Sequence, residues 1–285
     1  KRFQQALREN DVDYILSEGI AQQERGAQIL DVNVGVPGID EAQMLEQAVL
    51  ELQSVIDLPL QIDTSDSAAM ERALRRYNGK AVINSVNGKQ ESMEAVFPLA
   101  KKYGGLIIAL TLDEKGIPAT AEGRVQIARR ILKEAEKYGI ERENIVFDPL
   151  TMTVSADAGA AETTLAALER IERELKCHTV LGVSNVSFGL PDRDGINSVF
   201  ALAMGKGLSA AIMNPYSYEM MKTWHVFLAL SGKDENFSEY IRFSAGYEKK
   251  EIAVRDRAEH FIIFARAEEL GGEIYGKYAY VGFGG

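Results

Sequence analysis

The chain has 285 residues, of which 46% are hydrophobic and 26% charged, a composition typical of a globular protein and not of a disordered chain. The net charge of −10 (32 Lys and Arg against 42 Asp and Glu) argues against a duplex nucleic-acid partner, which needs clustered positive charge. No apolar run has the length of a membrane span, and the N-terminus, KRFQQALREND, has no apolar signal core. The single cysteine, Cys177, suits a reducing compartment, so we expect a cytoplasmic protein.

Seven short segments rich in Val, Ile and Leu predict β-strands. They are 28–35, 58–65, 80–86, 105–113, 144–150, 178–186 and 208–215. Between them, apolar residues at spacings of three and four predict helices over 12–25, 40–57, 67–77, 91–103, 122–138, 160–175, 194–205 and 217–231. This alternation predicts a parallel sheet closed as a (β/α)8 TIM barrel. An open doubly wound sheet is the weaker alternative, because DVNVGVPG lacks the G-x-G-x-x-G spacing.

Seven strands are one fewer than such a barrel needs. Either the first strand precedes Lys1, or the aromatic run Ile274–Phe283 in the C-terminal tail fills the gap. The alternation of strands and helices stops near residue 231, and the sequence after it carries more charged residues. We therefore expect a barrel over 1–231 and a charged tail or linker over 232–285, with a helix over 253–269 and a strand packed on the barrel.

Small polar residues lie near the ends of most of these strands, where a parallel barrel carries its functional face. Asp and Asn are poor strand formers, so their recurrence there is informative. The residues are Asp31, Asn33, Asp63, Asn84, Asp148, Ser184, Asn185 and Asn214. Each alone could cap a helix or fix a turn. Together they predict one shared polar pocket.

The pocket offers carboxylates and amides but no Lys, Arg or His. A carboxylate accepts two parallel hydrogen bonds from a guanidine-like edge, and an Asn amide both donates and accepts. A pterin ring presents both kinds of edge, and a purine is the nearest chemical alternative. No metal site is expected, because Cys177 and His178 are adjacent and no second cysteine completes a thiolate set.

Five segments carry a family resemblance: DVNVG, IDTSD, INSVNG, FDPL and, most specifically, GVSNVSFGLPDRDGINSVF. From Lys1 to about residue 230 the chain resembles the pterin-binding barrel of the methyltetrahydrofolate methyltransferases. That family includes the folate domain of cobalamin-dependent methionine synthase and the methyltetrahydrofolate:corrinoid protein methyltransferases. The family's first strand, which ends in an Arg-Ile-Asn-Pro-Thr-Gly-like segment, has no counterpart here.

The resemblance implies a dihydropteroate synthase-like barrel that moves the N5 methyl group of 5-methyltetrahydrofolate to cob(I)alamin, as in methionine synthesis. The cobalamin would be carried by a corrinoid-binding domain or protein, and a homodimer is compatible with the family. No membrane partner is expected. The implied pterin-binding residues are Asp63, Asn84, Asp148 and Asn185, with Asp31 and Asn33 at the pocket floor and Gly182 and Ser184 keeping its wall narrow.

Two of these residues are the implied catalytic residues. Asn185 matches the family residue that turns toward N5, and its amide would stabilise the protonated nitrogen as the methyl group departs. The proton would arrive through water near Asp148. An amide is no general acid at neutral pH, so the expected contribution is electrostatic.

Two alternatives remain open at this point. A dihydropteroate synthase shares the barrel and a pterin site, but its seventh strand normally brings a Lys near the pterin, and HTVLGVSNV has none. A folate-binding module that is inactive in isolation is the second alternative.

Overall fold

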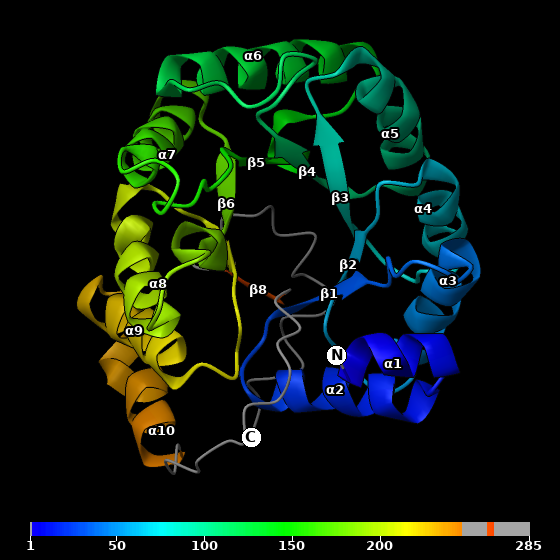
Figure 1. Cartoon of the computed structure of the whole chain (residues 1–285), viewed down its shortest axis with the longest axis horizontal. Helices are drawn as coiled ribbons and strands as arrows, with labels where there is room; N and C mark the ends of the chain where they lie inside the picture. The colour runs from blue at the N-terminus through cyan, green and yellow to red at the C-terminus, as the bar shows by residue number, and fades with distance from the viewer. Residues whose placement is uncertain (1, 247–260, 265–285) are drawn as a thin grey trace.

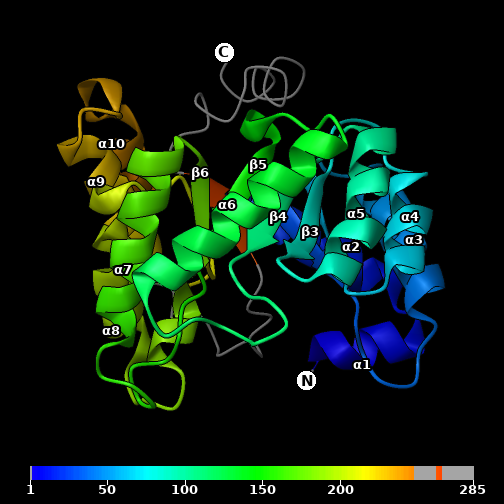
Figure 2. The same cartoon turned by 90° about the horizontal axis from the view of Figure 1, so that it is seen from above.

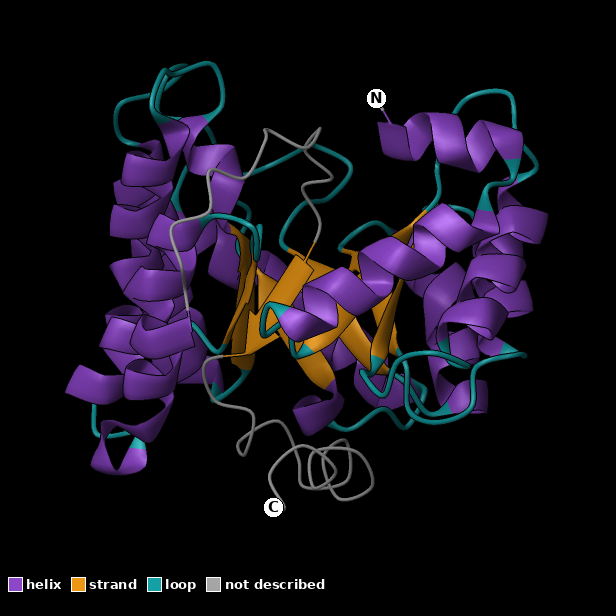
Figure 3. Cartoon of the chain, turned by 90° about the horizontal axis from the view of Figure 1, so that it is seen from below, coloured by secondary structure: helices purple, strands orange, loops and turns teal. Residues whose placement is uncertain are grey.

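Each of the seven predicted strands forms in the computed structural model of the chain, which describes residues 2–246 and 261–264. The strands pair in chain order, each parallel to the next. They are β1 (Ile29–Asn33), β2 (Leu60–Asp63), β3 (Val82–Asn87), β4 (Leu106–Leu110), β5 (Ile145–Asp148), β6 (His178–Gly182) and β7 (Ala210–Ile212). Figure 3 shows these strands enclosed by helices.

The predicted helices alternate with the strands and surround the sheet (Figure 1). They are α2 (Val12–Glu24), α3 (Glu41–Leu52), α4 (Ser67–Leu74), α5 (Gln90–Tyr103), α6 (Ala121–Lys137), α7 (Ala160–Arg170), α8 (Arg193–Ala201) and α9 (Tyr218–Leu230). Short 3-10 helices form at η1 (Arg142–Asn144), η3 (Val183–Ser187), η4 (Leu202–Lys206) and η5 (Glu235–Phe237), and a π-helical turn forms at η2 (Ile171–Leu175). The helix periodicity of the sequence therefore predicted the helical layer of the barrel.

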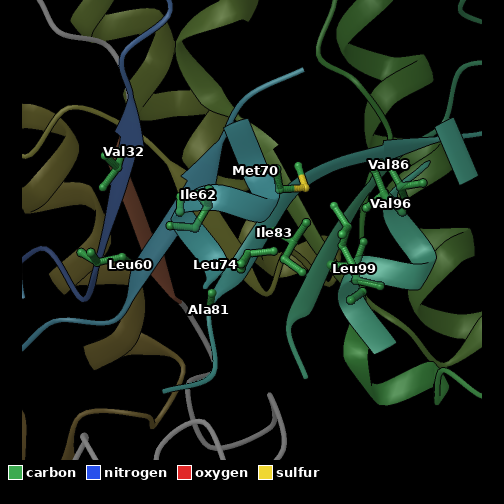
Figure 4. Close-up of a cluster of buried hydrophobic side chains, with 14 of the residues drawn as sticks. Val32, Leu60, Ile62, Met70, Leu74, Ala81, Ile83, Val86, Val96 and Leu99 are labelled. Atoms are coloured by element: carbon green, nitrogen blue, oxygen red, sulfur yellow. The ribbon is translucent and has the colours of Figure 1, made fainter. Parts of the chain in front are cut away.

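The strands are apolar on both faces for most of their length, as parallel strands covered by helices must be. Their outward side chains pack against the helices, and Figure 4 shows this outer core around Leu60, Ile62 and Ile83. Their inward side chains form a smaller cluster inside the barrel, namely Ile29, Val82, Leu106, Ile108, Val146, Val180 and Ala210. This inner cluster is the apolar floor on which the polar strand ends stand.

The eighth position of the barrel is filled by β8 (Phe261–Phe264), which lies between β7 and β1 and is antiparallel to both. Ile262 is paired with Ile29 on one side and with Ile212 on the other. The prediction of a helix over 253–269 is therefore wrong at 261–264. Phe and Ile have high strand propensity, and the unpaired edges of β1 and β7 offer hydrogen bonds that a helix would leave unmade. Ile274–Phe283 lies outside the described residues.

The structure also corrects the end of the sixth strand. The sequence predicts a strand over 178–186, but β6 ends at Gly182 and the chain turns into the 3-10 segment η3. Ser184 and Asn185 thus lie in a tight turn over the barrel mouth. A strand would alternate their side chains between two faces, whereas a 3-10 turn does not.

Two helices lie outside the predicted set. α1 (Arg2–Glu9) precedes α2, and α10 (Ser238–Gly246) packs on α9, where the ring of Phe243 stacks on His225 at 4.4 Å between centroids. The division of the chain at residue 231 stays a prediction. Among the described residues, no helix is long and apolar enough to cross a membrane.

Candidate active site

Three neighbouring strands bring polar side chains together at the carboxyl end of the barrel. The register pairs Asn33 of β1 with Asp63 of β2, and Asp63 with Asn84 of β3. The adjoining residues Val32, Ile62 and Ile83 belong to the outer core, so strand alternation turns the three polar side chains inward. Asn33 Nδ2 donates to Asp63 Oδ2 at 2.9 Å. The sequence-predicted residues of β1 to β3 thus form one continuous polar wall.

Asp63 has a second possible role, because it precedes α4 and could cap it. The structure gives that role to Asp66, whose Oδ1 accepts from the backbone amides of Ala68 and Ala69 at 2.8 and 3.3 Å. Asp63 instead faces the barrel interior beside Asn33. The carboxylate therefore faces the barrel interior and does not cap the helix.

A second carboxyl group lies deeper on the same wall. Asp31 is 8% exposed, and its Oδ1 accepts from Gln61 Nε2 at 2.7 Å on the neighbouring strand. Burial, and then the charge of Asp63, raise the pKa of Asp31 well above its ordinary value, while the Gln61 bond acts in the opposite direction. Asp31 therefore favours its neutral form where an exposed aspartate would be charged.

Asp148 ends β5 and faces the interior from another part of the barrel, because its neighbour Phe147 belongs to the outer core. The residue is 8% exposed, and its Oδ1 accepts from the Leu150 amide at 2.7 Å. Burial raises the pKa of Asp148 to about 7, against the opposing effects of the Leu150 amide and the charge of Arg124. Asp148 is thus poised to gain or lose a proton near neutral pH.

The end of β6 supplies the third part of the mouth. A Cβ added at Gly182 would lie 3.0 Å from Asn185 Nδ2, so the absence of a side chain there lets the amide lie close to the strand end. Asn185 itself is exposed. Ser184 fixes the turn, since its carbonyl accepts from Arg193 Nη2 at 2.8 Å and its hydroxyl accepts from Asn197 Nδ2 at 3.4 Å.

Another polar residue, Asn214, follows the last parallel strand. Asn214 after β7 accepts from the Tyr216 amide at 2.9 Å through Oδ1, which is a local turn interaction. Conversely, sequence reasoning missed Gln61 and Arg124. Gln61 shares the face of Asp63 two residues on, and this alternation could have identified it. Arg124 gives no such signal, because most of its contacts are with groups distant in the sequence, at Pro149, Leu150 and Thr164.

The arrangement suits a flat, hydrogen-bonding ligand more than an ion. Carboxylates and amides on the two sides of the mouth can accept from N–H groups and donate to ring nitrogens or carbonyls. The apolar floor beneath limits how deeply such a ligand descends. Within residues 2–246 and 261–264, no group of three His, Cys, Asp or Glu side chains is arranged to hold a metal ion.

A closed eight-stranded barrel whose carboxyl end carries inward carboxylates and amides defines the class of barrel enzymes with a site at the strand ends. Comparison with known proteins specifies the class further. Residues 1–214 match the model of a family described as pterin binding enzymes. The chain is 32% identical over 240 residues to the methylcorrinoid:tetrahydrofolate methyltransferase of Eubacterium limosum, a match that covers 82% of this chain and 88% of that protein.

The chain is also 32% identical over 230 residues to methionine synthase of Mycobacterium tuberculosis, covering 75% of this chain but 19% of that longer protein. Among solved structures, dihydropteroate synthases of Yersinia pestis and Stenotrophomonas maltophilia superpose with TM-scores of 0.64 and 0.63 at 15% and 19% identity. These matches cover 78% of this chain and 90% and 89% of those chains, and at such identity they show the fold alone. The chain belongs to the pterin-binding enzyme family and, within it, to the methyltetrahydrofolate methyltransferases.

Proposed function

We propose that the barrel mouth binds 5-methyltetrahydrofolate through its pterin ring and transfers the N5 methyl group to cob(I)alamin carried by a corrinoid protein or domain. The observation that carries the proposal is the pairing of a polar wall on β1 to β3 with the buried carboxyl group of Asp148. The 32% identity to a methylcorrinoid:tetrahydrofolate methyltransferase supports it. That relative is named for the opposite direction, and a catalyst accelerates both directions of one reaction.

In this proposal Asp148, once ionised, accepts two parallel hydrogen bonds from the N–H and exocyclic amine edge of the pterin. Asp63 and Asn84 bind the opposite part of the ring, with Asn33 holding Asp63 in place through its 2.9 Å bond. Asp31 lies beneath, and its raised pKa disfavours a second negative charge beside Asp63. Asp63 and Asp148 therefore orient the ring, while the raised pKa of Asp31 limits the repulsion between Asp31 and Asp63.

Methyl transfer needs a better leaving group than the amide anion that an unprotonated N5 would become. As the methyl carbon leaves, the electron pair of the C–N5 bond stays on nitrogen, which must take up a proton. The corrinoid of the partner supplies the nucleophile that receives the methyl group. Asn185 stabilises the protonated nitrogen through its amide oxygen, and its position beside Gly182 brings it to the mouth.

Calorimetric titration of the chain with 5-methyltetrahydrofolate tests the binding step. We expect Asp148→Ala to weaken binding about a hundredfold, because hydrogen bonds to a charged group contribute about 1.5–3 kcal/mol. Asp157→Ala, an exposed carboxylate on the same β5–α7 connection, is the matched control and should bind like the wild type. Unchanged binding by Asp148→Ala would refute the proposed site.

Methyl transfer to added cob(I)alamin tests the chemical step. Asn185→Ala should keep its affinity for the folate and lose at least about tenfold in transfer rate. A chain that binds the folate but transfers no methyl group would favour a binding module. Preference for dihydropterin pyrophosphate over the folate would favour a dihydropteroate synthase-like enzyme.

A further inference from the structure

Arg124 is a buried cation behind the proposed pterin site. It lies on the first turn of α6, the residue is 2% exposed, and α6 covers the sheet from outside beside α7 (Figure 2). An arginine removed from water is costly unless its donors and its charge are compensated. The contacts that compensate it identify what the residue does.

The donors of Arg124 converge on the connection that follows Asp148. Nη1 donates to the carbonyls of Pro149 and Leu150, each at 2.9 Å, and Nε donates to the Pro118 carbonyl at 3.1 Å. Nη1 also donates to Thr164 Oγ1 at 3.1 Å, and that hydroxyl is within 3.1 Å of the Leu150 carbonyl. The guanidinium therefore joins α6 and α7 to the two residues after β5.

These contacts fix an unusual backbone conformation. Leu150 has a φ of 68°, a left-handed conformation that is uncommon for a bulky residue. In this conformation its amide donates to Asp148 Oδ1 at 2.7 Å. By holding the carbonyls on both sides of the Leu150 amide nitrogen, Arg124 keeps that amide directed at the carboxylate.

The charge of Arg124 is compensated from the same direction. Its hydrogen bonds go to three carbonyls and one hydroxyl, and the carboxylate that acts on its charge is Asp148. The charge of Arg124 in turn holds down the pKa of Asp148 against the effect of burial. The other described carboxyl groups that face this end of the interior are Asp31 and Asp63, on β1 and β2.

We infer that Arg124 is a positioning residue for Asp148: it shapes the 148–150 turn and supplies the counter-charge behind the carboxylate. The importance of this for catalysis rests on the proposed function, in which Asp148 binds the pterin. The Arg124–Asp148 link itself concerns the protein without ligand. The two can therefore fail separately.

The test follows the titration of Asp148 by NMR in the full chain labelled with carbon-13 at aspartate carboxyl groups, with Asp148→Asn used for assignment. Arg124→Gln removes the charge and should raise the titration midpoint of Asp148 by roughly one unit. Arg124→Lys keeps the charge but not the fork of donors, so the midpoint should stay closer to the wild type. Arg129→Gln, an exposed arginine of the same helix that pairs with Glu174, is the matched control.

Folate binding then gives a second readout that loss of structure alone would not mimic. In Arg124→Gln, affinity should fall about fivefold at pH 7 and recover at pH 9, because less Asp148 is ionised at the lower pH. Arg124→Lys should bind more weakly at both pH values because the turn is less well held. A merely structural arginine would lower affinity equally at both pH values in Arg124→Gln.

If Arg124→Gln does not fold, Thr164→Val carries the same test, since it removes one acceptor of Arg124 and the hydroxyl beside the Leu150 carbonyl. A smaller upward shift of the Asp148 midpoint and faster hydrogen exchange at the Leu150 amide are expected. A midpoint that does not move in the folded variant would overturn the inference. A midpoint that moves, together with unchanged folate binding by Asp148→Ala, would refute the proposed function and leave the Arg124–Asp148 link standing.

Discussion

The two sides of the barrel mouth hold their carboxyl groups in different ways. On β1 and β2, Asp31 and Asp63 are held by amide side chains of the neighbouring strand, Gln61 and Asn33. Across the mouth, Asp148 is held by a backbone amide, with a buried arginine behind it. The register of the sheet fixes the side chains on β1 and β2, because they bond to one another across neighbouring strands. Asp148 depends instead on the loop after β5, which Arg124 holds in place.

The two sides also differ in what shifts the pKa of their carboxyl groups. The pKa of Asp31 is raised by burial and by a like charge, so a second negative charge next to Asp63 is avoided. The pKa of Asp148 is raised by burial to about 7, with Arg124 limiting the rise. The neighbouring charge therefore raises the pKa of the carboxyl group on one side of the mouth and lowers it on the other.

The largest expected effect concerns stability on the Asp148 side. A carboxyl group whose pKa is raised by folding costs stability as pH rises from its unfolded value, near 4, to its folded value, about 7. Asp148→Asn has no such cost, so above pH 7 it should be more stable than the wild type by on the order of 2–4 kcal/mol. At pH 4 the two should unfold alike. Thermal unfolding at both pH values measures this, and the exposed Asp157→Asn is the control. Equal stability of Asp148→Asn and the wild type at pH 8 would show that burial does not destabilise the ionised Asp148.

The next effect separates two neighbouring aspartates on the other side. Asp63→Ala should weaken folate binding about a hundredfold, by loss of charge-assisted hydrogen bonds. Asp66→Ala should leave binding intact but cost about 1 kcal/mol of stability, because it removes the cap of α4. Calorimetry and denaturant unfolding on both variants give the comparison. If the two variants behaved alike, Asp63 would be a structural residue.

These assignments show what could be read from the sequence. Asp31, Asp63 and Asp148 were predictable because a carboxylate in an otherwise apolar strand is costly unless a site needs it, and strand alternation places it inside. The closure of the barrel by β8 was not predictable, because Phe261–Phe264 lies in a charged stretch of sequence whose spacing favours a helix. The strand forms because the edges of β1 and β7 offer it hydrogen-bond partners. The 3-10 turn at Asn185 and the hydrogen bonds from Arg124 to the carbonyls of residues 149 and 150 depend on tertiary contacts. Such contacts give no periodic pattern in the sequence.

A smaller effect is the pH dependence of binding, which should come from the Asp148 side alone. As pH falls from 8 to 6 through the Asp148 pKa of about 7, the ionised fraction falls about tenfold, and folate affinity should fall with it. Asp148→Asn should bind weakly but with little pH dependence over that range. Titrations at several pH values with both proteins measure this. A pH dependence that persists in Asp148→Asn would move the titrating group to the β1–β2 wall, where Asp31 is the candidate.

The smallest expected effect is on the turn that follows β6. Gly182→Ala places a Cβ 3.0 Å from Asn185 Nδ2, so the amide must move by a few tenths of an ångström. Because Asn185 is proposed to act on N5 and not to hold the ring, the methyl-transfer rate should fall about fivefold while folate affinity changes less than about twofold. Gly246→Ala, whose added Cβ meets nothing within 4 Å, is the control. A loss of affinity without a loss of rate would make Asn185 part of the binding surface, and the stabilisation of the protonated nitrogen would then have to come from another group of the site.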